Sequence, residues 1–334
     1  MSPFQLRVAL VVASLAASAL TCPVAQAQND WPSKPVTVVV PSSAGGGTDV
    51  YARILAQALT EQFKQSFVVE NKPGASGAIG ATAVARAAPD GYTVLVASNS
   101  SLGINPVLYK TLQYDVSKDF IAVTRGVIAP MVVVAHPEAN VKTLAELLER
   151  GKREPGKVFY GTAGVGSPLY IGVRMLEAMG GGGISGGSSE LFSHVPYKGV
   201  APAYQDLLGG RLQFMLTDLA SARQFIDSGK LVALAITDKS KLLPKVPTFA
   251  EAGLLKYPAF TSFSVMLPAK TPQAIVQRLA AEIGKVMKDP TNFNKFEQQA
   301  LLPVFDTPEQ FSASLREEQL MWGNFIRQHN IQPD

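Results

Sequence analysis

Three short turns of the sequence combine glycine with hydroxyl-bearing side chains, and each directly precedes a predicted helix. They occupy residues 45–48, 164–167 and 197–200. The first turn of a helix carries backbone N–H groups that have no partner within the helix, and the positive end of the helix dipole lies there. Glycine also lets another molecule approach the main chain closely. The three turns are therefore suited to an anion, usually a phosphate or a carboxylate.

The first turn, Gly45-Gly46-Gly47-Thr48, matches neither common nucleotide-binding motif. No lysine follows the glycines as in G-x-x-x-x-G-K-[ST], and the spacing is not G-x-G-x-x-G. A turn that only reverses the chain would use the same residues, so both interpretations stay open at this point. We interpret Asp49 as a helix-start residue that the dipole stabilises, and not as a catalytic acid.

Residue types that could support catalysis are scarce in this sequence. Ser167 ends the second turn, but the turn lacks the G-x-S-x-G pattern of a nucleophile elbow. A serine triad also needs a histidine, and the chain has only His136, His194 and His329, each of which we expect to be structural. The sequence has no H-x-x-x-H motif, cysteine cluster or calcium-loop motif. We therefore expect no catalytic residue, no metal and no cofactor.

Two charged residues near the predicted turns have alternative roles. Asp218 follows a predicted strand at residues 213–216 and either reaches a ligand cleft or caps the next helix. Lys198, in the third turn, supplies positive charge either to a ligand or to a solvated surface. The sequence does not separate these alternatives.

The first 27 residues have the pattern of a secretory signal peptide. A single basic residue, Arg7, precedes an apolar run from about residue 8 to 20, and Ala-Gln-Ala at residues 25–27 supplies a small-x-small cleavage site. The run is shorter than the ~20 residues that a membrane-spanning helix needs. Cys22, the only cysteine, is an alternative lipoprotein attachment site. Cleavage after residue 27 would leave a mature chain without disulfides or thiol chemistry.

The expected mature chain, residues 28–334, is long enough for two domains of ordinary size. The full sequence has 30 basic and 26 acidic side chains, a net charge of +4, and the charges are interspersed. No dense block of lysine and arginine resembles those of nucleic-acid-binding or membrane-surface proteins. We expect no nucleic-acid partner and a monomeric protein.

Predicted strands and helices alternate along most of the chain, which is typical of α/β folds with mainly parallel strands. The predicted strands are residues 36–40, 67–70, 92–97, 120–127, 131–135, 158–161, 193–195, 213–216 and 231–237. The predicted helices are residues 49–63, 80–88, 144–150, 169–179 and 202–208, with a mostly helical tail from residue 271. Ligands of α/β sheets bind at the carboxyl ends of strands, where the three turns lie. Turns from two domains could therefore face one another across a cleft.

Local signals fix two of the helix starts and one loop. Ser167 can cap the helix at residues 169–179, with Pro168 at its first position. Thr307 and Gln310 have the spacing of a capping box before the last helix. Residues 180–189 are so rich in glycine and serine that we expect a loop.

The order of short motifs along the chain resembles that of the periplasmic substrate-binding proteins of tripartite tricarboxylate transporters. The resemblance covers essentially the whole mature length. It rests on residues 31–35 (WPSKP), 45–49 (GGGTD), 69–74 (VENKPG), 88–93 (APDGYT), 105–109 (NPVLY), 194–199 (HVPYKG), 206–210 (DLLGG), 246–253 (VPTFAEAG) and 268–272 (PAKTP). One such motif would be weak evidence, whereas this many in the same order make the resemblance strong.

The resemblance implies a type II periplasmic-binding-protein fold, in which two α/β domains joined by a two-strand hinge enclose a ligand cleft. Domain 1 would comprise residues 28–126 and 255–334, and domain 2 residues 127–254. Proteins of this family hold a ligand carboxylate through main-chain groups, hydroxyls and ordered water at turns from both domains. The matching positions here are Gly46, Gly47, Thr48, Ser98 and Asn99 in domain 1, Thr162, Gly166, Ser167, Tyr197 and Gly199 in domain 2, and Asp218, at a position that often senses the distal end of the ligand.

Three features depart from the family pattern. Ser42-Ser43-Ala44 stands where the family usually has an aromatic residue and a proline, which predicts a more polar or roomier pocket mouth. Phe263-Ser264-Val265 replaces the usual Trp-Phe-Gly near the return crossing between domains. The glycine- and serine-rich insertion at 180–189 is expected to affect only a surface loop.

These observations predict an exported, non-enzymatic receptor that binds a small organic carboxylate and delivers it to the permease subunits of a tripartite transporter. Di- and tricarboxylates, acidic amino acids and aromatic acids all remain open as ligands. One alternative is an exported hydrolase that uses Ser167 or Ser98 as nucleophile. Another is a receptor that serves a sensory partner, which the fold cannot distinguish from transport because the difference lies in the partner surface.

Overall fold

The computed structural model describes residues 31–181, 190–254 and 260–333. The predicted signal peptide, Cys22 and residues 182–189 of the predicted loop lie outside these ranges. Within them, no helix combines the length and the apolar character that crossing a membrane requires.

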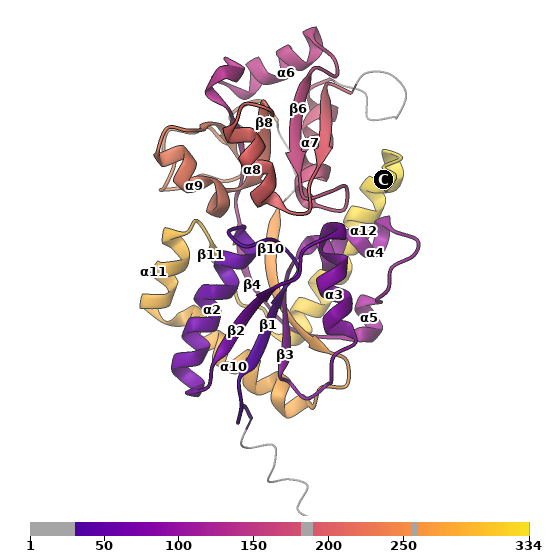
Figure 1. Ribbon diagram of the computed structural model, residues 1–334, viewed down its shortest axis with the longest axis vertical. Coiled ribbons are helices and arrows are strands. Elements are labelled where there is room, and N and C mark those ends of the chain that lie inside the picture. The colour runs from indigo at the N-terminus through magenta and orange to yellow at the C-terminus, as the bar shows by residue number, and fades with distance from the viewer. Residues whose placement is uncertain (1–30, 182–189, 255–259, 334) are drawn as a thin grey trace, which may run out of the picture.

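Two β-sheets form the centres of the lower and upper halves of the molecule as drawn in Figure 1. The first sheet has the strand order β11-β4-β10-β3-β1-β2, and the second has the order β7-β6-β8-β5-β9. The first comprises β1 (Val36–Val40), β2 (Phe67–Asn71), β3 (Thr93–Ser98), β4 (Phe120–Ala129), β10 (Thr261–Pro268) and β11 (Leu302–Pro303). The second comprises β5 (Met131–Ala135), β6 (Val158–Thr162), β7 (Phe192–Pro196), β8 (Phe214–Asp218) and β9 (Val232–Ile236).

Helices surround both sheets (Figure 1). Those joined to strands of the first sheet are α2 (Gly47–Phe63), α3 (Ala78–Ala85), α4 (Asn105–Leu108), α5 (Val116–Asp119), α10 (Gln273–Lys288), α11 (Pro290–Gln298) and α12 (Pro308–Gln328). Those joined to strands of the second are α6 (Leu144–Arg153), α7 (Pro168–Met179), α8 (Val200–Leu208) and α9 (Leu219–Asp227). Single turns of helix occur at η2 (Ala75–Gly77), η3 (Ser100–Ile104) and η4 (Pro137–Ala139).

The prediction of mainly parallel strands holds for only part of each sheet. Strand β1 pairs in parallel with β2 and β3, and β6 pairs in parallel with β7 and β8. Strands β4, β5, β9, β10 and β11 form antiparallel pairs. Parallel neighbours need a crossover helix between them. Here β4 instead runs through Pro130 directly into β5 of the other sheet, and no helix stands between β9 and β10. Strands β5 and β10 therefore enter their sheets antiparallel to their neighbours.

Local sequence signals located several elements closely. The strands at residues 36–40 and 131–135 have the predicted bounds. Helix α7 begins at Pro168 with Ser167 as its cap, and Thr307 and Gln310 form the predicted capping box of α12. No bounds were predicted for α9, although Asp218 was expected as one alternative to cap a helix that follows it, and strand β10 was not predicted. Strand β10 is buried along its whole length, so it lacks the alternating pattern of a half-exposed strand.

The C-terminal helix α12 links the two halves of the molecule. Its residues Phe311 and Leu315 belong to a hydrophobic cluster with Leu95 of the first sheet. Further along the helix, Trp322 and Ile326 belong to the cluster built around the second sheet. The helix therefore packs against both cores, and its course from the lower to the upper half is visible in Figure 1.

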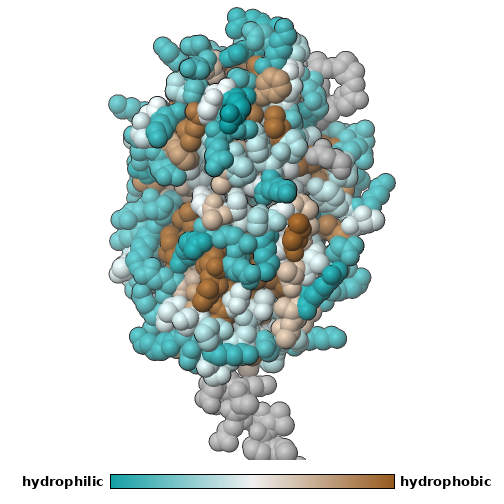
Figure 2. All heavy atoms as spheres, viewed as in Figure 1, coloured by the Kyte–Doolittle hydropathy of each residue, from teal (hydrophilic) through white to brown (hydrophobic). Residues whose placement is uncertain are grey.

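Hydrophilic residues cover most of the face shown in Figure 2, and hydrophobic residues form small separate groups on it. The large hydrophobic side chains with the greatest exposure are Val68, Ile79, Phe159, Phe293, Leu302 and Leu320. They come from different elements, and singly exposed apolar residues are normal for a folded protein.

Candidate ligand-binding site

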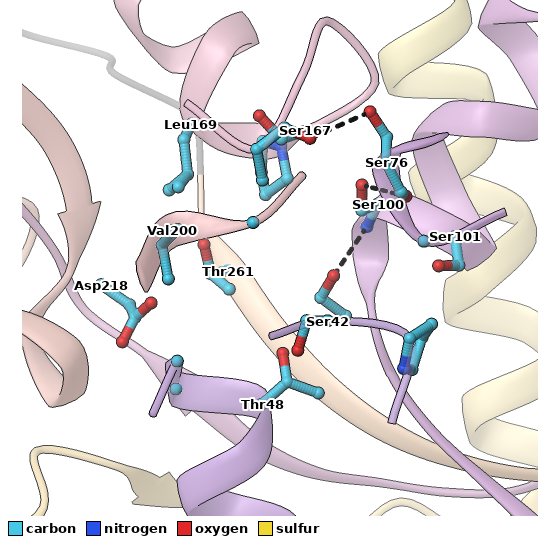
Figure 3. A pocket seen from close by; sticks show the side chains of 18 of the residues that line it. Ser42, Thr48, Ser76, Ser100, Ser101, Ser167, Leu169, Val200, Asp218 and Thr261 are labelled. Atoms are coloured by element: carbon cyan, nitrogen blue, oxygen red, sulfur yellow. Dashed lines mark hydrogen bonds between the residues drawn. The ribbon is translucent and has the colours of Figure 1, made fainter. Parts of the chain in front are cut away.

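A small cavity lies between the two sheets and has a volume of about 70 Å³ (Figure 3). This is room for only a few water molecules, so the cavity suits a small solute. Segments of the first sheet line it with Pro41, Ser42, Gly46, Gly47, Thr48, Ser76, Gly77, Ser98, Ser100, Ser101, Thr261 and Phe263. Segments of the second line it with Ala163, Ser167, Pro168, Leu169, Lys198, Gly199, Val200 and Asp218.

Three buried hydroxyl oxygens in the cavity wall have no hydrogen-bond partner among the described residues. They are Ser42 Oγ, after β1, Ser101 Oγ, in η3, and Thr261 Oγ1, at the start of β10. A buried polar group without a partner costs about 1–3 kcal/mol. A ligand that bonds to these hydroxyls would remove that cost.

The N-termini of α2, α7 and α8 meet at the cavity, as the three turns predicted. Gly46 precedes α2 and Gly199 precedes α8, and neither helix has a side-chain cap. Ser167 caps α7, because its Oγ accepts a 3.2 Å hydrogen bond from the backbone N–H of Tyr170. The positive ends of three helix dipoles therefore point toward one cavity.

Asp49 lies in the first turn of α2, in the structural role that the sequence indicated. Its Oδ2 accepts hydrogen bonds from the backbone N–H of Gly45 (3.0 Å) and from Arg53 Nε (2.9 Å). Its Oδ1 accepts one from Asn71 Nδ2 (3.0 Å). Burial raises the pKa of Asp49, but these hydrogen bonds together lower it below its usual value. The carboxylate thus fixes the glycine turn that presents Gly46 to the cavity.

Asp218 caps α9 and also contacts the start of α2 across the boundary between the two sheets. Its Oδ1 accepts hydrogen bonds from the backbone N–H (2.8 Å) and Oγ (2.7 Å) of Ser221. A Cβ atom at position 47 would overlap this same oxygen, so only glycine fits there. Burial raises the pKa of Asp218, while Ser221 and the backbone N–H of Gly47 lower it in part. Both roles that the sequence left open, cap and cavity residue, are therefore combined in Asp218.

Two serines of the first half hydrogen-bond to main-chain carbonyls of the second. Ser76 Oγ donates to Ala163 O (3.3 Å), and Ser100 Oγ donates to Gly166 O (2.6 Å). Figure 3 shows Ser76 and Ser100 beside Ser167 at the edge of the cavity. These bonds hold the turn before α7 against η2 and η3.

Seven of the eleven residues matched to family contacts line the cavity: Gly46, Gly47, Thr48, Ser98, Ser167, Gly199 and Asp218. The cavity lining does not include Asn99, Thr162, Gly166 or Tyr197. Asn99 Nδ2 donates to Phe260 O (2.9 Å), and Thr162 Oγ1 lies 2.7 Å from His194 Nε2. Tyr197 Oη donates to Asp206 (2.6 Å), and the Gly166 carbonyl accepts from Ser100. Each of the four thus has a hydrogen-bonding contact within the protein.

Several lining residues were not among the predicted contacts, namely Ser76, Ser100, Ser101 and Thr261 together with the apolar Leu169, Val200 and Phe263. Ser100 and Ser101 follow Ser98 at the end of β3, so the strand-end rule could have included them. Ser76 and Thr261 gave no local signal, because their positions depend on how distant segments pack.

The three histidines lie away from the cavity wall. His194 faces Thr162, and burial followed by the charge of Arg174 lowers its pKa to about 4. His136 Nδ1 accepts a hydrogen bond from the backbone N–H of Glu138, and the ring of His329 packs against Phe325 at a tilt of 50°. Among residues 31–181, 190–254 and 260–333, no three His, Cys, Asp or Glu side chains are grouped as metal ligands would be.

Comparisons with known proteins agree with this geometry. The family model described as "Tripartite tricarboxylate transporter family receptor" matches residues 51–331. Protein BugT of Bordetella pertussis is 32% identical over 317 residues, which cover 94% of this chain and 94% of that protein.

Two solved structures with bound acids share the fold. Rpa4515 of R. palustris with adipate has a TM-score of 0.86 and 30% identity, covering 91% of this chain and 100% of that one. MatC (Rpa3494) of Rhodopseudomonas palustris with bound malate has a TM-score of 0.81 and 28% identity, covering 89% and 100%. This is the fold of periplasmic solute-binding proteins, and it implies a periplasmic location. The chain belongs to the tripartite tricarboxylate transporter receptor family.

Proposed function

We propose that this protein binds a small organic carboxylate in the cavity between its two sheets and delivers it to the permease of a tripartite transporter. One observation carries the proposal. The unpartnered hydroxyls of Ser42, Ser101 and Thr261 and the starts of α2, α7 and α8 surround one small cavity. Hydroxyls and helix N-termini can donate hydrogen bonds to an anion, so the protein needs no positively charged side chain to hold it.

The available hydrogen bonds are sufficient for a useful affinity. A hydrogen bond to a charged group contributes about 1.5–3 kcal/mol. Micromolar binding requires about 8 kcal/mol, which several such bonds and the burial of an apolar ligand chain against Leu169, Val200 and Phe263 could supply. The bound adipate and malate of the two R. palustris structures support the choice of a carboxylate.

Two domains would close on the ligand in this proposal. Domain 1 would be residues 28–126 and 255–334, and domain 2 residues 127–254, with residues 1–27 removed as a signal peptide and the mature protein acting as a monomer. A ligand stabilises whichever state it contacts more. The contacts of Ser76 and Ser100 with the turn before α7 would then belong to the closed state.

We propose that the protein has no catalytic role. Ser167 Oγ accepts a hydrogen bond as a helix cap, and the described cavity lining includes no histidine that could activate it or Ser98. A hydrolase would instead turn over esters and be labelled by a serine-reactive phosphonate. Labelling of Ser98 or Ser167 would therefore overturn this part of the proposal.

A thermal-shift screen of the purified protein against a panel of organic acids tests the binding function. A ligand at 100 times its Kd adds about 2.7 kcal/mol to the free energy of unfolding, so at least one carboxylate should raise Tm by several degrees. Calorimetry then gives the affinity. If no carboxylate shifts Tm or binds in calorimetry, the proposal is wrong.

Delivery to a permease needs a separate test in cells. Uptake of the identified acid should require both this protein and the permease subunits of a tripartite transporter. Uptake that is unchanged when the gene for this protein is deleted, together with loss of an acid-induced response, would favour the sensory alternative.

A further inference from the structure

A buried acid of α12 contacts the segment η3, whose serines line the cavity. Glu318 is 7% exposed and is not itself part of the cavity lining. It lies between Leu315, which packs in a cluster with Leu95 of the first sheet, and Trp322, which packs in the cluster of the second. A carboxyl group at such a place is removed from water, so it needs hydrogen-bond donors from the protein.

Two side chains supply these donors. Trp322 Nε1 donates to Glu318 Oε1 over 3.1 Å, and the side chain of Asn99 makes a smaller hydrogen-bonding contribution. Burial raises the pKa of Glu318, and these bonds, with the charge of Arg125, lower it only in part. Glu318 can act as an acceptor in either charge state, because a protonated carboxyl group keeps an acceptor oxygen.

Asn99 joins Glu318 to two segments of the cavity wall. Its Nδ2 donates to Phe260 O (2.9 Å), and Phe260 directly precedes Thr261 at the start of β10. Asn99 itself directly precedes η3, which contains Ser101. The hydroxyls of Ser101 and Thr261 are two of the three buried, unpartnered hydroxyls of the cavity. The Asn99 side chain therefore links the segments that carry both.

The backbone of η3 also lies close against α12. Gln319 Nε2 donates to Leu102 O (2.7 Å). A Cβ atom at Gly103 would lie only 3.0 Å from Glu318 Oε1 and 3.4 Å from Trp322 Cδ1. The carboxyl group of Glu318 thus lies against the main chain of η3, and a shift of one requires a shift of the other.

On the basis of the function proposed above, we propose that Glu318 is a positioning residue for the ligand. Through Asn99 it sets where the hydroxyls of Ser101 and Thr261 lie, without touching the ligand itself. Without an acceptor oxygen at position 318, the Asn99 side chain loses a partner and holds Phe260 O less firmly. The start of β10 and η3 then move independently, and the ligand meets hydroxyls at the wrong spacing.

A matched pair of substitutions separates the acceptor oxygen from the size of the side chain. Glu318→Gln keeps the shape and an acceptor oxygen, whereas Glu318→Met has a similar length and no oxygen. Calorimetry with the acid found in the thermal-shift screen should show about tenfold weaker binding by Glu318→Met and at most threefold weaker binding by Glu318→Gln. Glu317→Met, at an exposed acid of the same helix, is the control and should bind as the wild type does.

Hydrogen exchange of the ligand-free proteins measures the positioning directly. In Glu318→Met, the backbone amides of residues 99–104 and 260–264 should exchange at least tenfold faster than in the wild type. Those of β8 should exchange at the same rate, and Glu318→Gln should restore the slow exchange. Faster exchange throughout the molecule would show a general loss of stability and would overturn the inference. If Glu318→Met does not fold, Asn99→Ala breaks the same link and should give the same local pattern.

The outcomes separate this inference from the proposed function. If Glu318→Met binds as tightly as the wild type, or if Glu318→Gln loses as much affinity as Glu318→Met, the inference is overturned while carboxylate binding stands. If no acid of the wider panel binds the wild type, the proposed function fails. The exchange rates then still decide whether Glu318 holds the two wall segments in place.

Discussion

The hydroxyl of Ser100 donates a buried 2.6 Å hydrogen bond to the carbonyl oxygen of Gly166, and this bond joins the two halves of the molecule. Ser100 belongs to η3, which follows β3 of the first sheet. Gly166 belongs to the turn between β6 and α7 of the second. The turn that the sequence assigned to the ligand is thus held partly by the protein itself.

Removal of this bond should weaken ligand binding more than folding. We expect Ser100→Ala to lower the affinity for the acid found in the thermal-shift screen about fivefold, because one hydrogen bond contributes roughly 1 kcal/mol to the closed arrangement. Calorimetry measures the effect. Ser228→Ala, which removes an exposed hydroxyl bonded only to Phe225 O (3.3 Å), is the control. Equal affinities for the two variants would show that the Ser100 bond does not support the site.

Thr48 and Ser167 line the same cavity but should respond differently to removal of their hydroxyls. Thr48 is not a helix cap, so Thr48→Val should lower affinity with little change in the free energy of unfolding. Ser167 caps α7, so Ser167→Ala should lower affinity and also cost about 1 kcal/mol of stability. Calorimetry and urea denaturation measure the two quantities. Unchanged affinity in both variants would remove these residues from the site.

Gly47 allows α2 and β8 to approach each other. A Cβ at position 47 would overlap Asp218 Oδ1 and lie 2.9 Å from Phe263 Cζ. Gly47→Ala should therefore push the two halves apart and lower affinity at least tenfold. At Gly46 the nearest atom to a new Cβ is Val200 Cγ2, at 3.1 Å, so Gly46→Ala should have a smaller effect. The reverse order of the two effects would contradict the close contact between Asp218 and Gly47.

His194 should make the fold sensitive to acid. Burial and Arg174 lower its pKa to about 4, whereas the unfolded chain binds this proton near 6.5. The stability that the neutral ring contributes is present above pH 6.5 and is lost as the pH falls through about 4. His194→Gln removes this dependence and can keep the contact with Thr162.

The measurement is the difference in Tm between the wild type and His194→Gln from pH 7 to pH 4. We expect the wild type to lose more stability on acidification than the variant. Glu177, whose pKa burial raises to about 7, titrates in the opposite direction in both proteins and cancels in the difference. A difference that stays constant with pH would show that His194 does not titrate as stated.

Tyr51 offers a test of core packing away from the cavity lining. Its side chain is fully buried in α2, stacks on Phe263, and its Oη has no hydrogen-bond partner among the described residues. Tyr51→Phe keeps the ring and removes the unpaired hydroxyl, so we expect it to raise stability by about 1 kcal/mol. Gly126→Ala should have the opposite effect, since its Cβ would overlap Tyr51 Oη. The double variant should recover only part of the loss in chemical denaturation, since the new Cβ would still lie 2.6 Å from the ring Cζ atom. A complete lack of recovery would contradict the contact with the hydroxyl.

The sequence by itself determined the elements and the chemistry of the turns between them. The starts of α7 and α12 follow from Ser167 and from Thr307 with Gln310, because these capping bonds span only three residues. The meeting of the turns before α7 and α8 also follows, since these helices start at the carboxyl ends of the paired strands β6 and β7. The helix caps depend on local hydrogen bonds, and the placing of helix starts depends on the α/β fold class. A sequence pattern is enough to predict both.

Only the tertiary structure decided which groups face the cavity. Thr162 and Tyr197 belong to the correct turns, but their hydroxyls bond to His194 and Asp206 instead of lining the site. Ser76 and Thr261 reach the site from distant parts of the chain, and Asp218 meets Gly47 only because the two sheets approach each other. The direction of a side chain and the contact between two sheets depend on packing over long sequence distances, which no local spacing of residues encodes.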